Sequence, residues 1–248
     1  MPQDTASSKP LPDWEQVLSA ATRLQTILPD AVLVGGTAAA VHAGHRFSRD
    51  ADHVLTDLRA HFDEVLSQLE SVAGWKTART RRPVLILGSL DGIETGVRQL
   101  IRQAPLETTV LDHQGVQLAV PTAAETLRIK GLLILRRNAT RDYLDFAALS
   151  EHLGVQETAE ALRSFDELYP QDNGESALQQ LQIQLASPVP YDLDDIELRE
   201  YKHLDQRWHD WESVKATCAS AAVDLFDRLR AEQDGNDGGG SPPSPPAP

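Results

Sequence analysis

Two short motifs constrain the fold of this chain more than any other feature. Gly35-Gly36-Thr37 follows an apolar run at residues 31–34, and Asp50-Ala51-Asp52 comes after a small, helix-prone stretch. On a β-strand, residues two apart point to the same face, so Asp50 and Asp52 would project together. The Gly-Gly turn would lead from a strand into a helix, whose free N–H groups can receive a phosphate. We therefore expect a phosphate-binding turn close to a pair of carboxylates.

This combination is typical of nucleoside-triphosphate chemistry. Two adjacent carboxylates repel each other, and Mg²⁺ prefers hard oxygen ligands that it shares with substrate phosphates. Two other classes of enzyme use an Asp-x-Asp motif. In haloacid-dehalogenase phosphatases the motif follows a hydrophobic strand, whereas here it follows the polar run at residues 45–49. Metal-dependent glycosyltransferases lack the Gly-Gly turn upstream. The sequence therefore favours a nucleotide-binding site.

The charge of the chain is unevenly distributed. The net charge is −14, but residues 1–150 carry 17 acidic and 16 basic side chains, whereas residues 151–248 carry 20 acidic and 7 basic ones. A basic patch for nucleic acid can therefore still exist on the first part. Basic residues gather in two places, Arg79 to Arg82 and Arg136 to Arg141. The chain has no apolar run of the ~18–20 residues that span a membrane, and one cysteine, Cys218, so we expect a cytoplasmic protein.

Hydrophobic periodicity predicts an α+β fold, with a small mixed β-sheet flanked by helices and a helical region after it. We expect a helix from Asp13, strands near residues 31–34, 51–55 and 116–120, and a hairpin of residues 84–87 and 93–100 around the Asp91-Gly92 turn. Thr122 to Glu125 forms a capping-box pattern that opens another helix. The predicted domains are 13–153, which carries both motifs, and 154–232, an acidic helical domain whose last long helix carries Tyr201 to Cys218. Residues 1–12 and 233–248 are expected to be disordered tails.

The motifs resemble those of a known family. Val34 to Thr37 with Asp50-Ala51-Asp52 is similar to the signature of the DNA polymerase beta-type nucleotidyltransferase superfamily. More narrowly, the run from Gly44 to Asp52 resembles the AbiEii/AbiGii toxin family, which includes the MenT toxins. Two later blocks, Pro121 to Lys130 and Arg141 to Asp145, are similar to the Lys and Arg-Asp-x-x-Asp motifs of that family. The resemblance covers about residues 30–150 and implies that 13–153 is a nucleotidyltransferase domain.

The resemblance implies a role for each matching residue. Asp50 and Asp52 would hold Mg²⁺, with Mn²⁺ as an alternative. The triphosphate would contact Gly35, Gly36, Thr37 and Arg46, and Lys130 would neutralise its charge. Asp145 matches a late essential Asp, which would orient Lys130 or the base. From the residues alone, Lys130 could equally extend its charged end to solvent, and Asp145 could simply pair with Arg141 on the surface.

A third carboxylate is expected on a strand beside the pair, where it would take the proton of the attacking hydroxyl and help to hold the metal. Glu94 is the candidate, because it follows the Asp91-Gly92 turn. A solvent-facing Glu94 is the alternative. His53, directly after Asp52, could contact the nucleotide, although a structural role is favoured.

Three functions remain open at this point. The first is transfer of a nucleoside monophosphate from an NTP to an acceptor hydroxyl, and the resemblance implies tRNA as the acceptor, a role as a toxin and an antitoxin protein as partner. The second keeps the chemistry but modifies a protein or a small molecule, as aminoglycoside nucleotidyltransferases do. The third is a degenerate fold that binds a partner without catalysis.

Overall fold

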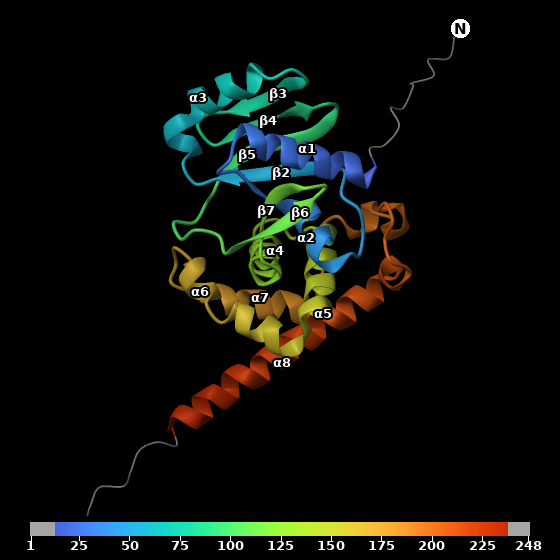
Figure 1. Cartoon of the computed structure of the whole chain (residues 1–248). Coiled ribbons are helices and arrows are strands. Elements are labelled where there is room, and N and C mark those ends of the chain that lie inside the picture. The colour runs from blue at the N-terminus through green and yellow to red at the C-terminus, as the bar shows by residue number, and fades with distance from the viewer. Residues whose placement is uncertain (1–12, 238–248) are drawn as a thin grey trace, which may run out of the picture.

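The computed structural model of the chain describes residues 13–237 and has a sheet on one side and a helical body on the other (Figure 1). The sheet has the strand order β1-β2-β5-β4-β3. Its strands are β1 (Val32–Leu33), β2 (Asp50–Leu55), β3 (Trp75–Arg81), β4 (Leu85–Leu90) and β5 (Ile93–Gln99). Strands β2 and β5 are parallel and the other neighbours are antiparallel. The α+β class with a small mixed sheet is therefore confirmed.

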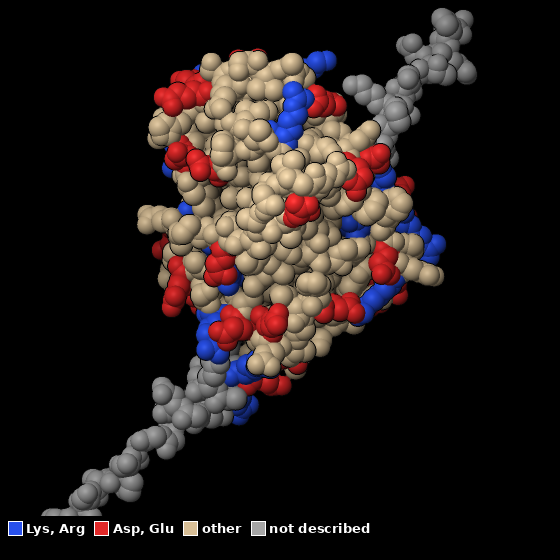
Figure 2. All heavy atoms as spheres, in the orientation of Figure 1, with Lys and Arg blue, Asp and Glu red and all other residues tan. Residues whose placement is uncertain are grey.

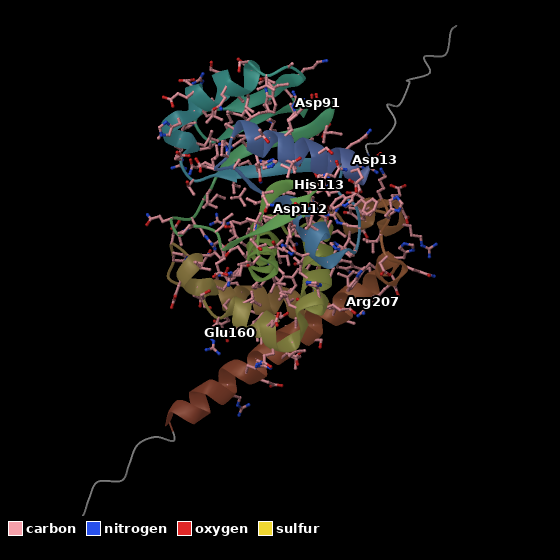
Figure 3. The ribbon with its side chains drawn as sticks, viewed as in Figure 1. Asp13, Asp91, Asp112, His113, Glu160 and Arg207 are labelled. Carbon is pink, nitrogen blue, oxygen red and sulfur yellow. The ribbon has the colours of Figure 1, made fainter. Side chains whose placement is uncertain are left out.

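Helices α1 (Trp14–Ile27) and α3 (Leu58–Glu70) cover one face of the sheet. Helix α1 begins where the sequence predicts, because the Asp13 carboxylate accepts from the Gln16 backbone N–H at 2.8 Å and the Gln16 side chain completes a capping box. Figure 3 shows Asp13 at this end of the helix. Apolar residues of both helices pack on Ile86 and Val97 of the sheet. The packing leaves the opposite face of the sheet for the functional site.

The helical body lies below the sheet in Figure 1. It contains α2 (Gly35–Ala43), α4 (Ala123–Arg137), α5 (Thr140–Leu162), α6 (Phe165–Leu168), α7 (Ala177–Ala186) and α8 (Trp211–Asp237). One hydrophobic cluster runs from Ala39 of α2 to Leu225 of α8. A hairpin of β6 (Thr108–His113) and β7 (Val116–Pro121) leads into α4. Helix α5 is kinked at Gly154, close to the predicted domain boundary, but the core continues across it.

The structure differs from the sequence-based expectations in three places. The edge strand β3 and strand β6 are additional to the predicted strands. The residues from Tyr201 to His209 were expected at the start of the last helix. In the structure residues 201–205 form a turn, Gln206–His209 is a short 3₁₀ helix, and α8 begins at Trp211. The capping box at Thr122 is only half formed, because the Glu125 carboxylate contacts Arg102 and Arg128.

The predicted tails lie mostly outside the part that the structure describes. Residues 1–12 and 238–248 are not described, whereas residues 233–237 belong to α8. Within residues 13–237, no helix combines the length and the apolar character that a bilayer span requires.

Candidate active site

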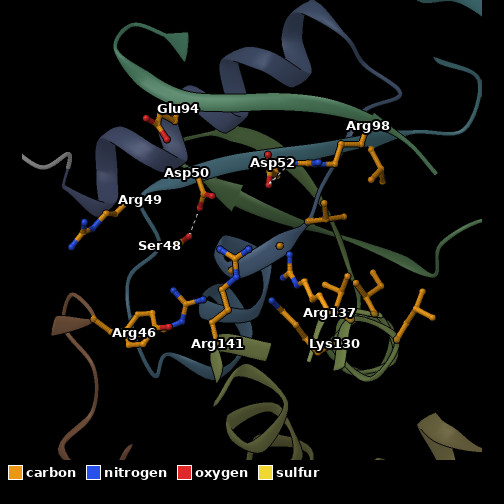
Figure 4. Close-up of a pocket in the computed structure, with 18 of the residues that line it drawn as sticks. Arg46, Ser48, Arg49, Asp50, Asp52, Glu94, Arg98, Lys130, Arg137 and Arg141 are labelled. Carbon is orange, nitrogen blue, oxygen red and sulfur yellow. Dashed lines mark hydrogen bonds and ion pairs between the residues drawn. The ribbon is translucent and has the colours of Figure 1, made fainter. Parts of the chain in front are cut away.

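A cleft of about 800 Å³ lies between the open face of the sheet and the helical body. Its upper wall is formed by β2 and β5, and its lower wall by α4 and the start of α5 (Figure 4). The beginning of α2 and the segment 195–202 also line it. A cavity of this size is in the range of small-molecule binding sites.

Strand register places the predicted carboxylates on the cleft side of the sheet. Asp50 is paired with Glu94 across β2 and β5, and Asp52 is paired with Gly96. Asp50, Asp52 and Glu94 all line the cleft. The intervening Ala51 and Thr95 are buried on the other face, as the two-residue period of a strand requires. The structure thus places Glu94 on the strand next to the one that carries the Asp pair.

Asp52 lies at the centre of the cleft and is mostly surrounded by protein. Burial raises its pKa above the ordinary value of 3.8, and the neighbouring Asp50 adds to the shift. Arg98 of β5 acts in the other direction and lowers the pKa of Asp52, because its Nη2 lies 3.6 Å from Asp52 Oδ2 (Figure 4). Asp50 accepts a hydrogen bond of 2.7 Å from the Ser48 hydroxyl. The carboxylate pair therefore carries concentrated negative charge that a cation can relieve.

The first turn of α2 requires its two glycines. Gly35 has a φ of 78°, a conformation that L side chains rarely adopt. A Cβ on Gly36 would lie 2.5 Å from Nη2 of Arg46. Both glycines line the cleft, so backbone N–H groups at the start of this helix can approach an anion.

Thr37 has a different contact from the one expected. Its side chain is fully buried, it is absent from the cleft lining, and its hydroxyl donates to the backbone carbonyl of Asp50. Thr37 therefore ties α2 to the strand that carries the carboxylates and does not present its hydroxyl to a triphosphate.

A buried cluster of charges lies beneath the cleft. Asp145 is fully buried and accepts two hydrogen bonds from Arg46, of 2.8 and 2.9 Å, and lies 2.6 Å from Nζ of Lys130. His45 Nε2 lies 2.8 Å from the same carboxylate. Burial alone would raise the pKa of Asp145, but Arg46, Lys130 and His45 together hold it well below its usual range. This arrangement positions Arg46 and Lys130 at the cleft surface.

The other residues singled out in the sequence differ in whether they reach the cleft. Asp145 pairs with Arg46 and Lys130 rather than with Arg141, whose side chain lines the cleft instead. His53 is fully buried behind the carboxylate strand, where burial lowers its pKa to about 4, so it does not reach the cleft. The basic residues at 79–82 lie on or next to the edge strand β3, whereas Arg137 and Arg141 line the cleft.

Sequence reasoning missed several residues of the cleft. Arg98 had no motif to mark it, and Ser48 lies in the run from Gly44 to Asp52 but was given no role. Their proximity to the carboxylates follows from strand pairing and a loop conformation. The segment 195–202 brings Glu197, Glu200 and Tyr201 to the lining of the cleft. The ring of Tyr201 lies 5.5 Å from the Arg46 guanidinium carbon. No motif in the acidic C-terminal part of the sequence indicates that this segment lines the cleft.

The donor set is suited to a magnesium ion. Within residues 13–237, no three His, Cys, Asp or Glu side chains lie close enough together to form a complete metal site. Mg²⁺ is usually bound by one or two carboxylates together with substrate phosphates, and two neighbouring Asp side chains meet this requirement. Asp50 and Asp52 would hold such an ion. Glu94 lies on the adjacent strand but is not part of a closed cluster.

A glycine turn at a helix start, a carboxylate pair on a mixed sheet and buried cations beneath them are the features of a nucleotidyltransferase. Residues 16–232 match the family described as nucleotidyl transferase AbiEii toxin, Type IV TA system. Since this match covers most of the chain, the chain belongs to the AbiEii nucleotidyltransferase family. The resemblance noted in the sequence is thus confirmed.

The curated relatives that this chain matches are much longer. The chain is 32% identical over 246 residues to the heme uptake protein MmpL11 of Mycobacterium tuberculosis, with 93% of this chain and 24% of that protein covered. It is 28% identical over 221 residues to the mycolic acid-containing lipids exporter MmpL11 of Mycolicibacterium smegmatis, with 88% and 22% covered. The chain thus spans about a quarter of the length of these curated relatives.

Among solved structures, a nucleotidyltransferase from H. pylori is similar with a TM-score of 0.49 and 17% identity. The similarity covers 88% of this chain and 97% of that one.

Proposed function

We propose that this chain is a Mg²⁺-dependent toxin of a toxin–antitoxin pair that transfers a nucleoside monophosphate from an NTP to a hydroxyl at the 3′ end of tRNA. The observation that carries the proposal is the Asp50 and Asp52 pair facing the start of α2 in one cleft. The family match, which names a Type IV toxin–antitoxin system, supports the biological role and an antitoxin as partner.

The reaction follows from the chemistry of the groups in the cleft. The acceptor oxygen attacks the α-phosphorus of the NTP, and the bond from that phosphorus to the bridging oxygen breaks. Pyrophosphate leaves with the electron pair of that bond, and the hydroxyl proton passes to a carboxylate, for which Glu94 is the candidate. Mg²⁺, when bound, would neutralise the charge that develops on the phosphates. Gly35, Gly36, Arg46 and Lys130 would hold the triphosphate through N–H groups and positive charge.

An RNA end suits the cleft better than a long stretch of RNA backbone. The face of the described residues in Figure 2 shows Lys and Arg standing among Asp and Glu, without a continuous basic stripe. Basic side chains gather instead inside the cleft, where Arg49, Arg98, Arg137 and Arg141 line its walls. Phosphates of a single-stranded end could approach these cations.

A second acceptor class has a specific observation in its favour. Asp195, Glu197 and Glu200 also line the cleft. Such carboxylates suit a cationic acceptor, which could be an amine-bearing small molecule or a basic protein segment.

Labelling separates the two acceptors. Each α-³²P-labelled NTP is incubated with the protein, Mg²⁺ and either total tRNA, total protein or an aminoglycoside. We expect label in the tRNA, and none when periodate has first oxidised the 3′-terminal ribose. Label that survives periodate treatment would contradict the 3′ end as acceptor. Label found only on protein or on the aminoglycoside would mean that the acceptor belongs to the second, cationic class and is not tRNA.

Glu94→Gln tests the proton acceptor. We expect the rate of transfer to fall by about 10²–10⁴-fold, because a carboxamide cannot accept the hydroxyl proton. Glu94 is exposed, so the fold should be unaffected. Single-turnover kinetics with saturating NTP measure the change, and the exposed Glu107→Gln serves as a control. An unchanged rate would remove Glu94 from the reaction and leave its carboxylate as a solvent-facing group.

A further inference from the structure

One half of the cleft is apolar, although the other half contains the carboxylates and cations. Its lining side chains are Val54, Leu100, Ile101, Leu106, Ile129 and Leu133. In Figure 4, unlabelled side chains drawn in carbon only gather beyond Arg98 and Lys130, away from Arg49 and Glu94. Resting on the proposed function, we infer that this half is the pocket for the base of the donor NTP.

Strand register places the apolar half next to the reacting phosphates. Along β2, Asp50, Asp52 and Val54 face the cleft in succession, and Arg98 is the partner of Val54 on β5. Residues two apart on a strand are separated by about 7 Å. Val54 is thus one step beyond the carboxylate that would hold the metal. A ribose spans a gap of this kind between the α-phosphate and a base.

The wall of the apolar half is held in shape by a buried arginine. Arg102 donates to the backbone carbonyls of Ala104 at 3.0 Å and Pro105 at 2.7 Å, so it fixes the loop that follows β5. The same guanidinium lies 2.8 Å from the Glu125 carboxylate, and the exposed fraction of the Arg102 side chain is 5%. Burying such a pair contributes little net stability because both charges lose their hydration. Its effect here is a preformed wall.

The loop also presents an exposed aliphatic side chain at the cleft. Ile101 is 80% exposed, although it borders a cavity lined by other apolar residues. A planar base lying against Ile101 and Leu106 would remove this surface from water, which is favourable. A phosphate would lose its hydration against these aliphatic side chains, so an uncharged ring suits this surface better.

The opposite half of the cleft suits the acceptor. Glu94, the candidate proton acceptor, is paired with Asp50 at the other end of the row of cleft-facing residues. The attacking hydroxyl must reach this carboxylate, so the acceptor enters from the Asp50 end. The apolar end is then available to the donor base.

The test compares an NTP with the same polyphosphate lacking a base. Titration calorimetry with Mg²⁺ gives the Kd of each NTP and of inorganic tripolyphosphate for wild-type protein and for the Ile101→Ser/Leu106→Ser variant. We expect the Kd of the best-bound NTP to rise about tenfold, while that of tripolyphosphate stays within about twofold. Ile183→Ser is the matched control, because Ile183 is a 67% exposed isoleucine on α7 outside the cleft. This control should change neither Kd.

Three results would overturn the assignment. An equal rise in the Kd of NTP and of tripolyphosphate would mean that the loop acts on the phosphates. An unchanged Kd for both ligands would mean that no base lies there. A raised KM for the acceptor with an unchanged Kd for NTP would assign the pocket to an acceptor base. If wild-type protein binds neither NTP nor tripolyphosphate, the proposed function itself fails. Should the double variant unfold, Ile101→Ser alone is tested, since that side chain is mostly exposed.

Discussion

Asp52→Ala is expected to reduce nucleotide transfer by about three orders of magnitude or more while leaving the protein folded. The carboxylate lies at the centre of the cleft, where it would hold the metal and the charge on the transferring phosphate. Loss of one such group removes an interaction that strengthens in the transition state. The measurement is the rate of label transfer from α-³²P-NTP at saturating Mg²⁺.

Stability provides the second readout for Asp52→Ala. Burial raises the pKa of Asp52, so the stability that this carboxyl contributes is present below its unfolded pKa and is lost as pH rises through the folded value. At neutral pH the ionised group is therefore a cost, and its removal should leave the Tm unchanged or slightly higher. The shift in Tm caused by Mg²⁺-NTP should disappear.

A matched control is Asp57→Ala. Asp57 follows the same strand but its side chain is 57% exposed and lies outside the cleft lining. The Asp57→Ala variant should retain the wild-type rate of transfer and the shift in Tm that Mg²⁺-NTP causes. Transfer at the wild-type rate in Asp52→Ala would remove the carboxylate pair from the reaction and with it the proposed mechanism.

The parts of the fold that were predictable follow from local chemistry. The Asp91-Gly92 turn specifies the hairpin of β4 and β5, and Asp13 caps α1, because each signal acts within a few residues. Strand β3 escaped prediction because only Trp75 of its seven residues is buried. An edge strand exposed in this way shows no alternation of apolar and polar residues.

The site was predictable to the extent that one strand or one turn determines it. The common direction of Asp50 and Asp52 follows from the period of a strand, and the glycines mark the turn before α2. Arg98 could not be found, because its place beside Val54 depends on the pairing of β2 with β5. The segment near Tyr201 was predicted as helix. In the structure, backbone bonds to the loop before β2, from Phe47 N–H to Lys202 and from Asp205 N–H to His45, hold it in short turns.

Asp145→Asn is expected to lower the free energy of unfolding by about 3–5 kcal/mol. The change leaves the buried Arg46 without its ionised partner and Lys130 with Asp142 alone, whose Oδ1 lies 3.4 Å from Nζ, and a poorly compensated buried charge is strongly unfavourable. This loss is a large fraction of the roughly 5–15 kcal/mol that typically stabilises a domain. Urea unfolding followed by circular dichroism measures it.

Two further variants test whether the loss of stability in Asp145→Asn comes from the buried charges and not from removal of any paired carboxylate. Asp63→Asn removes an exposed partner of Arg82, where both side chains are more than half exposed, and should cost less than about 1 kcal/mol. The double variant Asp145→Asn/Lys130→Met removes one of the stranded cations, so it should be less destabilised than the sum of its single variants. If the losses in free energy of unfolding of the two single variants add up in the double variant, Asp145 and Lys130 do not interact. This would contradict the distance of 2.6 Å between Lys130 Nζ and Asp145 Oδ2.

The pH dependence of the Asp145→Asn effect has a definite sign. Arg46, Lys130 and His45 hold the folded pKa of Asp145 well below 3.8, so its contribution is present above its unfolded pKa and is lost as pH falls through the folded value. The difference in stability between wild type and variant should thus stay constant from neutral pH down to about 5 and narrow only below about 4. A difference that already narrows between neutral pH and about pH 5 would contradict this lowered pKa of Asp145.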